Sequence, residues 1–202
     1  SKGSSRHASK RLEVYNGSLP HFMRSLYHDQ LPGEGFEARR LHRFANTEKS
    51  RVKGIMVSQA RNNISSGGQT VMRLGVAPPE DSMNYYRRVM QQPDELTQVS
   101  THLLGADSLL IAGSDSAKNL VFTGFLQVTY KKSLEEAGYL KYRMLNRKRW
   151  YPVSVIFLRH ESGIMIDPNG YYYPPQLIYS MDYWAWSEKI PHMLPIDYKP
   201  GN

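Results

Sequence analysis

Residues 141–167, KYRMLNRKRWYPVSVIFLRHESGIMID, combine a basic segment with the most apolar strand-like run of the chain. Five cations and three aromatic rings come first, and the apolar run at residues 152–159 follows directly. Both sets of alternating residues in this run are mostly apolar, which is typical of a central strand covered on both faces. The stretch therefore predicts a buried strand preceded by a basic, aromatic-rich surface segment.

Hydrophobic spacing and turn residues predict the other elements. Helices are expected at residues 19–27 (capped by Ser18, with Pro20 in the first turn), 34–46, 80–92, 93–104 and, from the capping box of Ser133 and Glu136, up to about Asn146. Strands are expected at residues 12–15, 52–58, 69–76, 108–112, 120–130, 164–167 and 171–173, with a loop at 62–68 and turns at 113–116, 160–163 and 168–170. The strand at 164–167 is expected to form a hairpin with 152–159.

These elements predict an α+β fold with a mainly antiparallel or mixed sheet and about five helices. Residues 1–11 are polar and basic, and we expect a flexible arm there. Residues 12–202 are expected to form a single domain. Its last part, residues 174–202, is rich in proline and aromatic residues and predicts a tail that packs over the core or forms an interface.

The composition of the 202 residues excludes several classes of protein. The sequence has no cysteine, so disulfides, thiolate metal sites and cysteine nucleophiles are excluded. No apolar run approaches the length of a membrane span, so we expect no transmembrane segment. The first residues lack the apolar core of a secretory signal, so secretion by that route is not expected. These features predict a cytoplasmic or virion-associated protein.

Charge is the strongest global feature of the sequence, with a formal net charge of +8. The net charge is +8 over residues 1–73, −3 over 74–130, +6 over 131–160 and −3 over 161–202. Two basic blocks that alternate with two mildly acidic ones suggest one basic face or groove. A polyanion is the natural partner of such a face, and nucleic acid is the commonest polyanion.

Two groups of residues are candidate sites, one for contact with DNA or RNA and one for self-association. Cations neutralise phosphates and an exposed indole stacks on bases, so the predicted nucleic-acid-binding residues are Arg39, Arg40, Arg43, Lys141, Arg143, Arg147, Lys148, Arg149 and Trp150. Rings gathered near the C-terminus suggest self-association, and Tyr183, Trp184 and Trp186 are the predicted interface.

Signs of an active site are weak. None of the seven histidines belongs to an HExxH motif, and the GSDS turn at 113–116 is not a G-x-S-x-G motif. We expect no metal and no cofactor. A metal-independent ribonuclease would need a histidine base beside a cation, and the candidates are His160 or His42 with Arg159 or Arg149.

The sequence thus favours a non-enzymatic structural or assembly protein that binds the nucleic-acid backbone, such as a coat, matrix or nucleoprotein-like subunit. Three alternatives stay open. They are a sequence-specific DNA-binding regulator, a metal-independent ribonuclease, and a protein–protein interaction module whose basic face meets an acidic partner.

Overall fold

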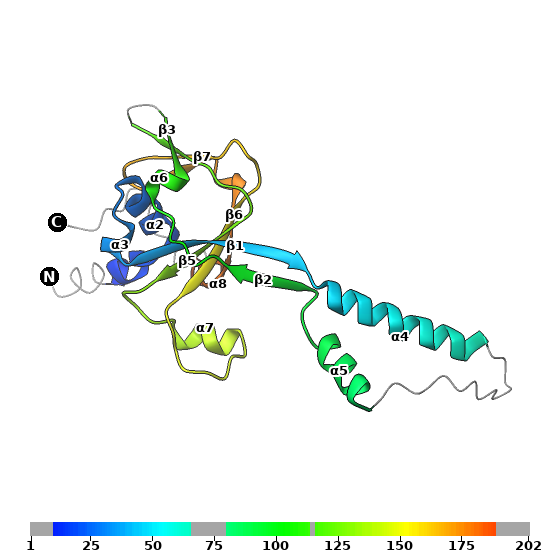
Figure 1. Ribbon diagram of the computed structural model, residues 1–202. Coiled ribbons are helices and arrows are strands. Elements are labelled where there is room, and N and C mark those ends of the chain that lie inside the picture. The colour runs from blue at the N-terminus through cyan, green and yellow to red at the C-terminus, as the bar shows by residue number, and fades with distance from the viewer. Residues whose placement is uncertain (1–9, 66–79, 114–115, 189–202) are drawn as a thin grey trace. The chain divides into compact units, whose positions relative to one another are not determined.

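The computed structural model describes residues 10–65, 80–113 and 116–188 (Figure 1). It has a mixed α+β fold with two antiparallel sheets, so the predicted class is confirmed. The chain divides into two compact units, one of residues 1–42 and 99–202 and the other of residues 43–98. The extent of the predicted single domain remains a prediction.

The larger sheet has the strand order β2-β1-β5-β6-β9. Its strands are β1 (Phe36–Ala45), β2 (Glu95–Val99), β5 (Phe125–Tyr130), β6 (Val153–Leu158) and β9 (Ile178–Asp182). The predicted strand at 152–159 is confirmed as β6, which pairs with β5 on one side and β9 on the other. The apolar residues of β6 on both faces fit this position inside the sheet.

A second sheet has the order β3-β4-β7-β8 and is built from short strands. They are β3 (Leu110–Ala112), β4 (Lys118–Leu120), β7 (Ile164–Ile166) and β8 (Tyr172–Tyr173). The predicted strands at 164–167 and 171–173 are confirmed, but the expected hairpin with 152–159 is wrong. Both edges of β6 are already paired within the larger sheet, and Gly163 lets the chain pass against the Leu120 carbonyl of β4, where an added Cβ would lie 2.4 Å from the oxygen.

The hydrophobic core of this unit lies between the inner faces of the two sheets. Ala38, Leu126, Val128 and Ile156 line it from the larger sheet, and Leu120, Ile164 and Ile166 line it from the smaller sheet. Helix α2 (Leu19–Tyr27) adds Phe22, Met23 and Leu26, all fully buried. As predicted, Ser18 caps this helix by accepting a hydrogen bond from the His21 amide at 3.3 Å.

Short helices complete this unit. They are α3 (Leu31–Glu34), α6 (Ala106–Leu109), α7 (Ala137–Tyr142), the 3-10 helix η1 (Pro175–Leu177) and α8 (Tyr183–Ser187), and residues 10–15 are also helical. In Figure 1 the strands β3 and β7 lie above the larger sheet and α7 lies below it. The core residues Ala38, Leu126 and Ile156 mark the inner face of the larger sheet, and the residues that alternate with them along each strand lie on its outer face.

The second unit is built on helices α4 (Thr47–Ser65) and α5 (Glu80–Met90). The buried Asn46 caps α4 by accepting from the Lys49 amide at 3.0 Å, and its side-chain nitrogen donates to the Pro93 carbonyl at 3.1 Å. Val52 and Val89 are its buried apolar residues among those described. The helix predicted at 80–92 is confirmed.

Several predicted elements are wrong, and two of the errors have one cause. Residues 34–46 are expected to be helical but form β1 after the short α3, and residues 93–104 are expected to be helical but contain β2. Hydrogen bonds between the two segments, from the Ser100 amide to Arg40 and from the Leu104 amide to Ala38, both 2.8 Å, satisfy backbone groups that a helix would have used. Tertiary pairing overrides local helix propensity here.

Other predicted boundaries also differ from the structure. Residues 52–58, expected as a strand, lie within α4, and residues 12–15, also expected as a strand, are helical. The segment at 108–112 begins as α6 before it becomes β3, and the segment at 120–130 is broken between β4 and β5. The loop at 62–68 begins inside α4, and its remainder, with the strand at 69–76, residues 1–9 of the arm and part of the turn at 113–116, lies outside the described residues.

Glu188 connects the end of α8 to the start of α2. Its carboxylate accepts a hydrogen bond from the Leu19 amide at 2.6 Å, one of the donors that a helix N-terminus leaves free. Burial raises the pKa of Glu188 to about 7, and this amide hydrogen bond offsets only part of the effect. Because the folded protein holds this proton more tightly than the unfolded chain, the stabilisation is complete below pH 4.5 and is lost as the pH rises through 7.

We therefore predict that Glu188→Gln flattens the pH dependence of stability. The wild type should lose up to about 3 kcal/mol of unfolding free energy between pH 4.5 and 8 through this group, and the variant should not. Urea unfolding at several pH values, compared between the two proteins, measures the difference. Parallel pH profiles would show that the Glu188 carboxylate titrates as it does in the unfolded chain.

Candidate functional site

A buried carboxylate holds the basic segment that the sequence singles out. The side chain of Glu135 is 4% exposed and receives two hydrogen bonds from the Arg147 guanidinium, at 2.7 and 2.9 Å. It also accepts from the Trp150 amide at 3.1 Å, and the Glu135 amide donates to the Trp150 carbonyl at 2.8 Å. The Arg149 guanidinium donates to the Glu135 carbonyl. Residues 141–150, which comprise the end of α7 and the segment after it, are here called the basic loop. The contacts of Glu135 with Arg147, Arg149 and Trp150 fix the C-terminal end of this loop.

The charge of Glu135 is stabilised by these contacts. Burial acts to raise its pKa, but the hydrogen bonds from Arg147 and from the Trp150 amide outweigh burial, and the pKa of Glu135 is lowered. The carboxylate is therefore ionised at neutral pH, and the ion pair with Arg147 persists until the solution is acidic. The capping box predicted at Ser133 and Glu136 is wrong, because α7 begins at Ala137 and the Glu136 side chain makes no capping hydrogen bond.

The basic loop leaves α7 through a Schellman motif, a helix ending whose last turn is closed by two backbone hydrogen bonds. The Leu145 amide donates to the Leu140 carbonyl at 2.9 Å, and the Met144 amide donates to the Lys141 carbonyl at 3.2 Å. Met144 occupies the left-handed position of the motif, with φ of 52°. Glycine or asparagine usually fills this position, and another residue costs about 1 kcal/mol.

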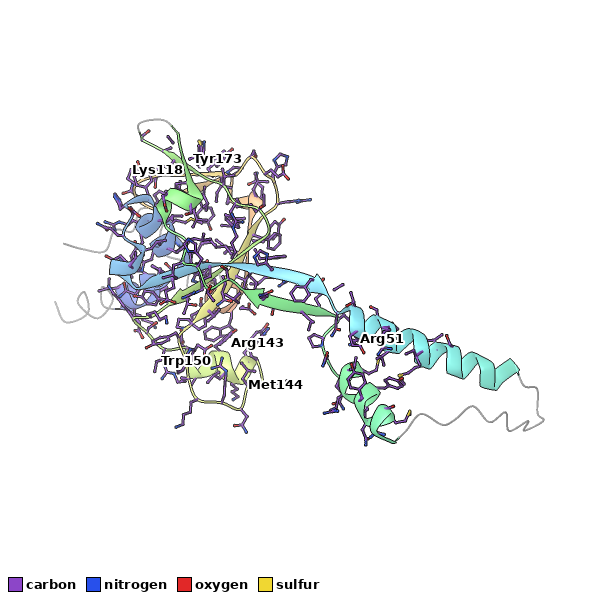
Figure 2. All side chains as sticks on the ribbon, viewed as in Figure 1. Arg51, Lys118, Arg143, Met144, Trp150 and Tyr173 are labelled. Carbon is purple, nitrogen blue, oxygen red and sulfur yellow. The ribbon has the colours of Figure 1, made fainter. Side chains whose placement is uncertain are left out.

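Large apolar side chains point from the basic loop into solvent (Figure 2). Met144 is 93% exposed, Trp150 and Tyr142 are each 64% exposed, and Leu145 is 40% exposed. The Trp150 ring contacts Tyr151 at 5.4 Å between centroids. These exposed side chains, here called the apolar tip, make the segment a candidate interaction surface.

The five predicted cations of this segment fall into two groups. Arg147 and Arg149 bind Glu135, and Arg143 lies 3.5 Å from Asp182. Within the described part of the chain, Lys141 and Lys148 form no ion pair with a carboxylate. Lys141 and Lys148 are therefore the cations of the loop whose charge is not balanced by a described carboxylate.

The three arginines predicted on one helix face lie instead along strand β1. Arg39 is on the outer face of the larger sheet, where it donates to the Ser100 and Thr101 carbonyls and pairs with Glu37 at 3.4 Å. Arg40 is on the opposite side of the strand and donates to the Thr123 carbonyl at 3.1 Å. Arg43 belongs to the second unit, where its guanidinium lies 3.9 Å from Glu95.

The outer face of the larger sheet carries a row of three aromatic rings. The sequence does not indicate that these rings lie side by side. The strand register places Phe125 opposite Phe157 and Phe157 opposite Tyr179. Ring centroids are 5.5 Å apart in the first pair and 5.0 Å in the second, where the rings are stacked at 11°. Phe125 and Phe157 are half-buried and Tyr179 is 40% exposed. These residues are called the ring row.

A cation lies at the end of the ring row. The Arg159 guanidinium, just past the end of β6, lies 3.4 Å from the Tyr179 hydroxyl and has no carboxylate partner among the described residues. Arg39 and Gln127 form the next row of the same face, since they are opposite each other in the register. The outer face therefore presents rings, an amide and guanidinium groups together.

The rings predicted as an interface lie against the protein itself. Trp184 is 2% exposed, packs against Phe22 with the rings tilted by 49°, and donates from its indole nitrogen to the Gly17 carbonyl at 2.7 Å. Tyr183 and Trp186 contact the buried Tyr139 ring, at 5.1 and 5.6 Å between centroids. Trp184 is thus part of the core of its own chain.

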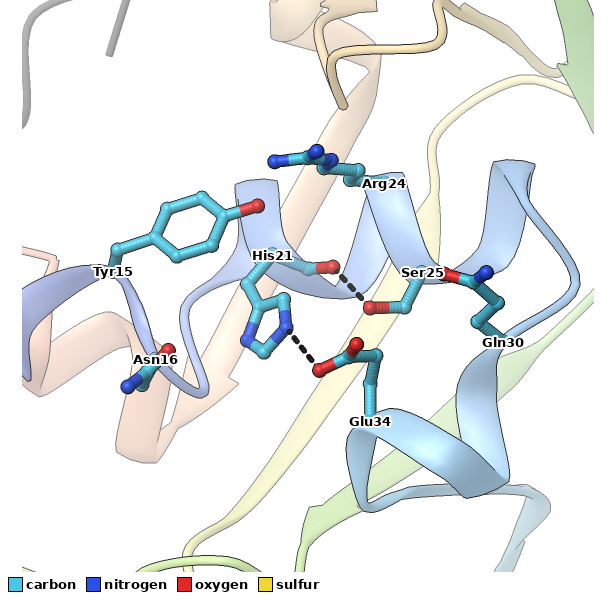
Figure 3. Close-up of a pocket in the computed structure, with 7 residues that line it drawn as sticks. All are labelled: Tyr15, Asn16, His21, Arg24, Ser25, Gln30 and Glu34. Carbon is cyan, nitrogen blue, oxygen red and sulfur yellow. Dashed lines mark hydrogen bonds and ion pairs between the residues drawn. The ribbon is translucent and has the colours of Figure 1, made fainter. Parts of the chain in front are cut away.

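A small polar pocket lies around His21 and Glu34, beside the N-terminal helical segment (Figure 3). His21 Nδ1 accepts from the Gly17 amide at 3.0 Å, so Nε2 carries the proton and donates to Glu34 at 3.3 Å. Burial lowers the pKa of His21 despite the nearby Glu34. Both ring nitrogens are engaged, so His21 has a structural role and no nitrogen available as a base.

The residues suggested for ribonuclease chemistry are not assembled into a site. His160 lies in a turn with its Nδ1 3.0 Å from the Ser162 hydroxyl, and His42 is an exposed residue of β1. Arg159 contacts Tyr179 and Arg149 contacts Glu135.

The described ranges lack two other kinds of site. No three His, Asp or Glu side chains gather there in a way that could hold a metal ion. None of the helices there combines the length and the apolar character that a membrane span requires.

No protein-family model, curated protein sequence or solved structure matches this chain.

We predict that Arg147→Ala destabilises the unit by about 2–4 kcal/mol, because it leaves the buried Glu135 carboxylate without its cation. The basic loop should also become a substrate for trypsin, which cleaves after its lysines and arginines. Urea unfolding and limited proteolysis of the folded protein measure the two effects. Lys148→Ala, one residue away and without an ion pair to any described carboxylate, is the control and should match the wild type in both. Equal stability of the two variants would contradict the role given to Glu135.

Proposed function

We propose that this chain is a non-enzymatic structural protein that binds single-stranded nucleic acid on the outer face of its larger sheet. The ring row, Phe125, Phe157 and Tyr179, is the observation that carries the proposal. Its centroid separations of 5.5 and 5.0 Å are about one strand spacing. A single strand that crosses the sheet would meet the rings in succession.

Stacking is the first contribution that this face can make to binding. Every base has a π-face, so an exposed ring binds bases with little regard to sequence, at about 1–3 kcal/mol per stacked base. Bases in a duplex already stack on each other and are not free to do so. The ring row therefore favours unpaired nucleic acid over a duplex.

Charge on the outer face supports the same ligand. Arg159 has no carboxylate partner among the residues described, and Arg39 is held in place by two carbonyl groups beside Gln127. The one acidic residue that the register places nearby, Glu37, pairs with both Arg39 and Lys131, at 3.4 and 3.3 Å. The face thus keeps a positive balance, in line with the net charge of +8.

We predict that Tyr179→Ala weakens binding of a labelled single-stranded oligonucleotide by about 5- to 100-fold. Arg159→Ala should lower the slope of log K against log salt by about 0.7, because one phosphate contact is lost. Fluorescence anisotropy over about 50–300 mM salt measures both. Tyr179→Phe keeps the ring and should bind like the wild type. A wild type that binds no oligonucleotide at the lowest salt, or a Tyr179→Ala variant with unchanged affinity, would refute the proposal.

The basic loop provides a comparison within the same experiment, because it is the site that the sequence predicts for this ligand. If a Lys148→Ala, Trp150→Ala double variant loses oligonucleotide affinity and Tyr179→Ala does not, nucleic acid binds at the loop and not at the ring row. Thermal unfolding of each variant checks that its fold is kept.

Four further measurements test the proposed role and its alternatives. Light scattering on the same samples tests assembly, which requires that particle mass grows when nucleic acid is added. A large ratio of specific to non-specific affinity would point to a regulator instead. Cleavage of labelled RNA in EDTA would point to a ribonuclease. Binding of acidic proteins without nucleic acid would point to an interaction module.

A further inference from the structure

We propose that the basic loop docks on the surface of an anionic lipid bilayer, with Met144 and Trp150 entering the boundary between head groups and acyl chains. Lys141 and Lys148 would contact the lipid phosphates and carboxylates. This inference concerns a different surface from the ring row and does not rest on the proposed binding of nucleic acid.

Met144 is the first reason for this assignment. It lies at the left-handed position of the Schellman motif, where glycine or asparagine fits without strain, and it is 93% exposed. A strained residue that packs against almost nothing gains little for the fold. Strain of this kind is typical of functional positions, and a long thioether side chain in water suits an apolar ligand.

Two other exposed residues of the basic loop belong to types that favour the membrane interface. Trp150 is 64% exposed and Leu145 is 40% exposed on the same loop. Indole and phenol rings concentrate at the head-group level of membranes, because one part of the ring is apolar and one part is polar. Burial of these exposed apolar side chains between lipid head groups and acyl chains would add to the affinity of the loop for a membrane.

Cations flank these apolar residues in the sequence. Lys141 and Lys148 form no ion pair with a carboxylate in the described part of the chain, and Arg143 lies 3.5 Å from the partly exposed Asp182. Clusters of lysine and arginine next to apolar residues bind the negative surface of anionic membranes. The phosphates of nucleic acid would attract the same cations, but they leave the exposed methionine without a role.

The loop is prepared for docking by its own structure. The buried Glu135 holds Arg147 and the Trp150 backbone, and the Schellman motif sets the position of Met144. Little conformational entropy is lost on binding when the binding segment is already ordered. The variants that test docking therefore leave Glu135 and Arg147 unchanged.

The test uses the whole chain and sedimentation with vesicles of phosphatidylcholine alone or with about 30% phosphatidylserine. We expect the wild type to bind the anionic vesicles at least tenfold more tightly than the neutral ones. Met144→Asn should lower this affinity about tenfold while it leaves thermal stability unchanged or raised, since asparagine tolerates the left-handed conformation. Lys141→Ala with Lys148→Ala should lower the affinity about 25-fold.

Trp150 fluorescence gives a second readout. Addition of anionic vesicles should shift the emission to the blue, and Trp150→Phe should remove the shift, because Trp184 is buried in the core and Trp186 packs against the Tyr139 ring. Tyr179→Ala, which removes the exposed ring of the ring row, should bind vesicles like the wild type.

Two results would overturn the inference. One is a wild type that does not sediment with anionic vesicles at low salt, and in that case a loss of oligonucleotide affinity in the loop variants would assign the loop to nucleic acid. The other is vesicle binding that Met144→Asn and the double lysine variant leave unchanged.

Discussion

The ion pair between Glu135 and Arg147 is the interaction on which the exposed part of this protein depends. A buried carboxylate is costly unless cations and amides surround it, and Glu135 has one guanidinium and one amide in direct contact with its oxygens. Those contacts come from residues 12 and 15 positions further along the chain, so satisfying Glu135 requires that the segment between them close into a loop. Glu135 is occupied by Arg147, and Lys141 and Lys148 form no ion pair with a carboxylate in the described part of the chain.

The sequence predicts elements with strong local signals better than elements that are decided by strand pairing. The strand β6 and helices α2 and α5 are found where apolar spacing and the Ser18 cap predict them, because burial and capping are local signals. Strands β1 and β2 are mistaken for helices, because their arginines and leucines fit helical spacing and only their mutual pairing decides otherwise. The hairpin assigned to β6 and β7 fails for the same reason, since a strand does not specify which sheet it joins.

Candidate sites show the same division. The concentration of cations and rings at residues 141–150 is visible in the sequence, and the structure places those residues on one exposed loop. The sequence does not indicate that two of the arginines bind Glu135, because this requires that Glu135 be buried. The ring row is invisible for a different reason. Phe125, Phe157 and Tyr179 are more than 20 residues apart from one another, and only the strand register brings them together.

The contacts that Trp184 and Glu188 make with the region of α2 have a consequence for folding during synthesis. Its indole donates to Gly17, and Glu188 binds the amide of Leu19, so helix α2 is completed by residues about 167 positions away. Contacts between such distant parts of a chain form slowly, because a long loop must close first. The Phe22 ring of α2 also contacts Phe36, only 14 residues further along the chain, but its contact with Trp184 must wait until α8 is made. The packing around α2 is therefore complete only after the segment that carries Trp184 and Glu188 has been made.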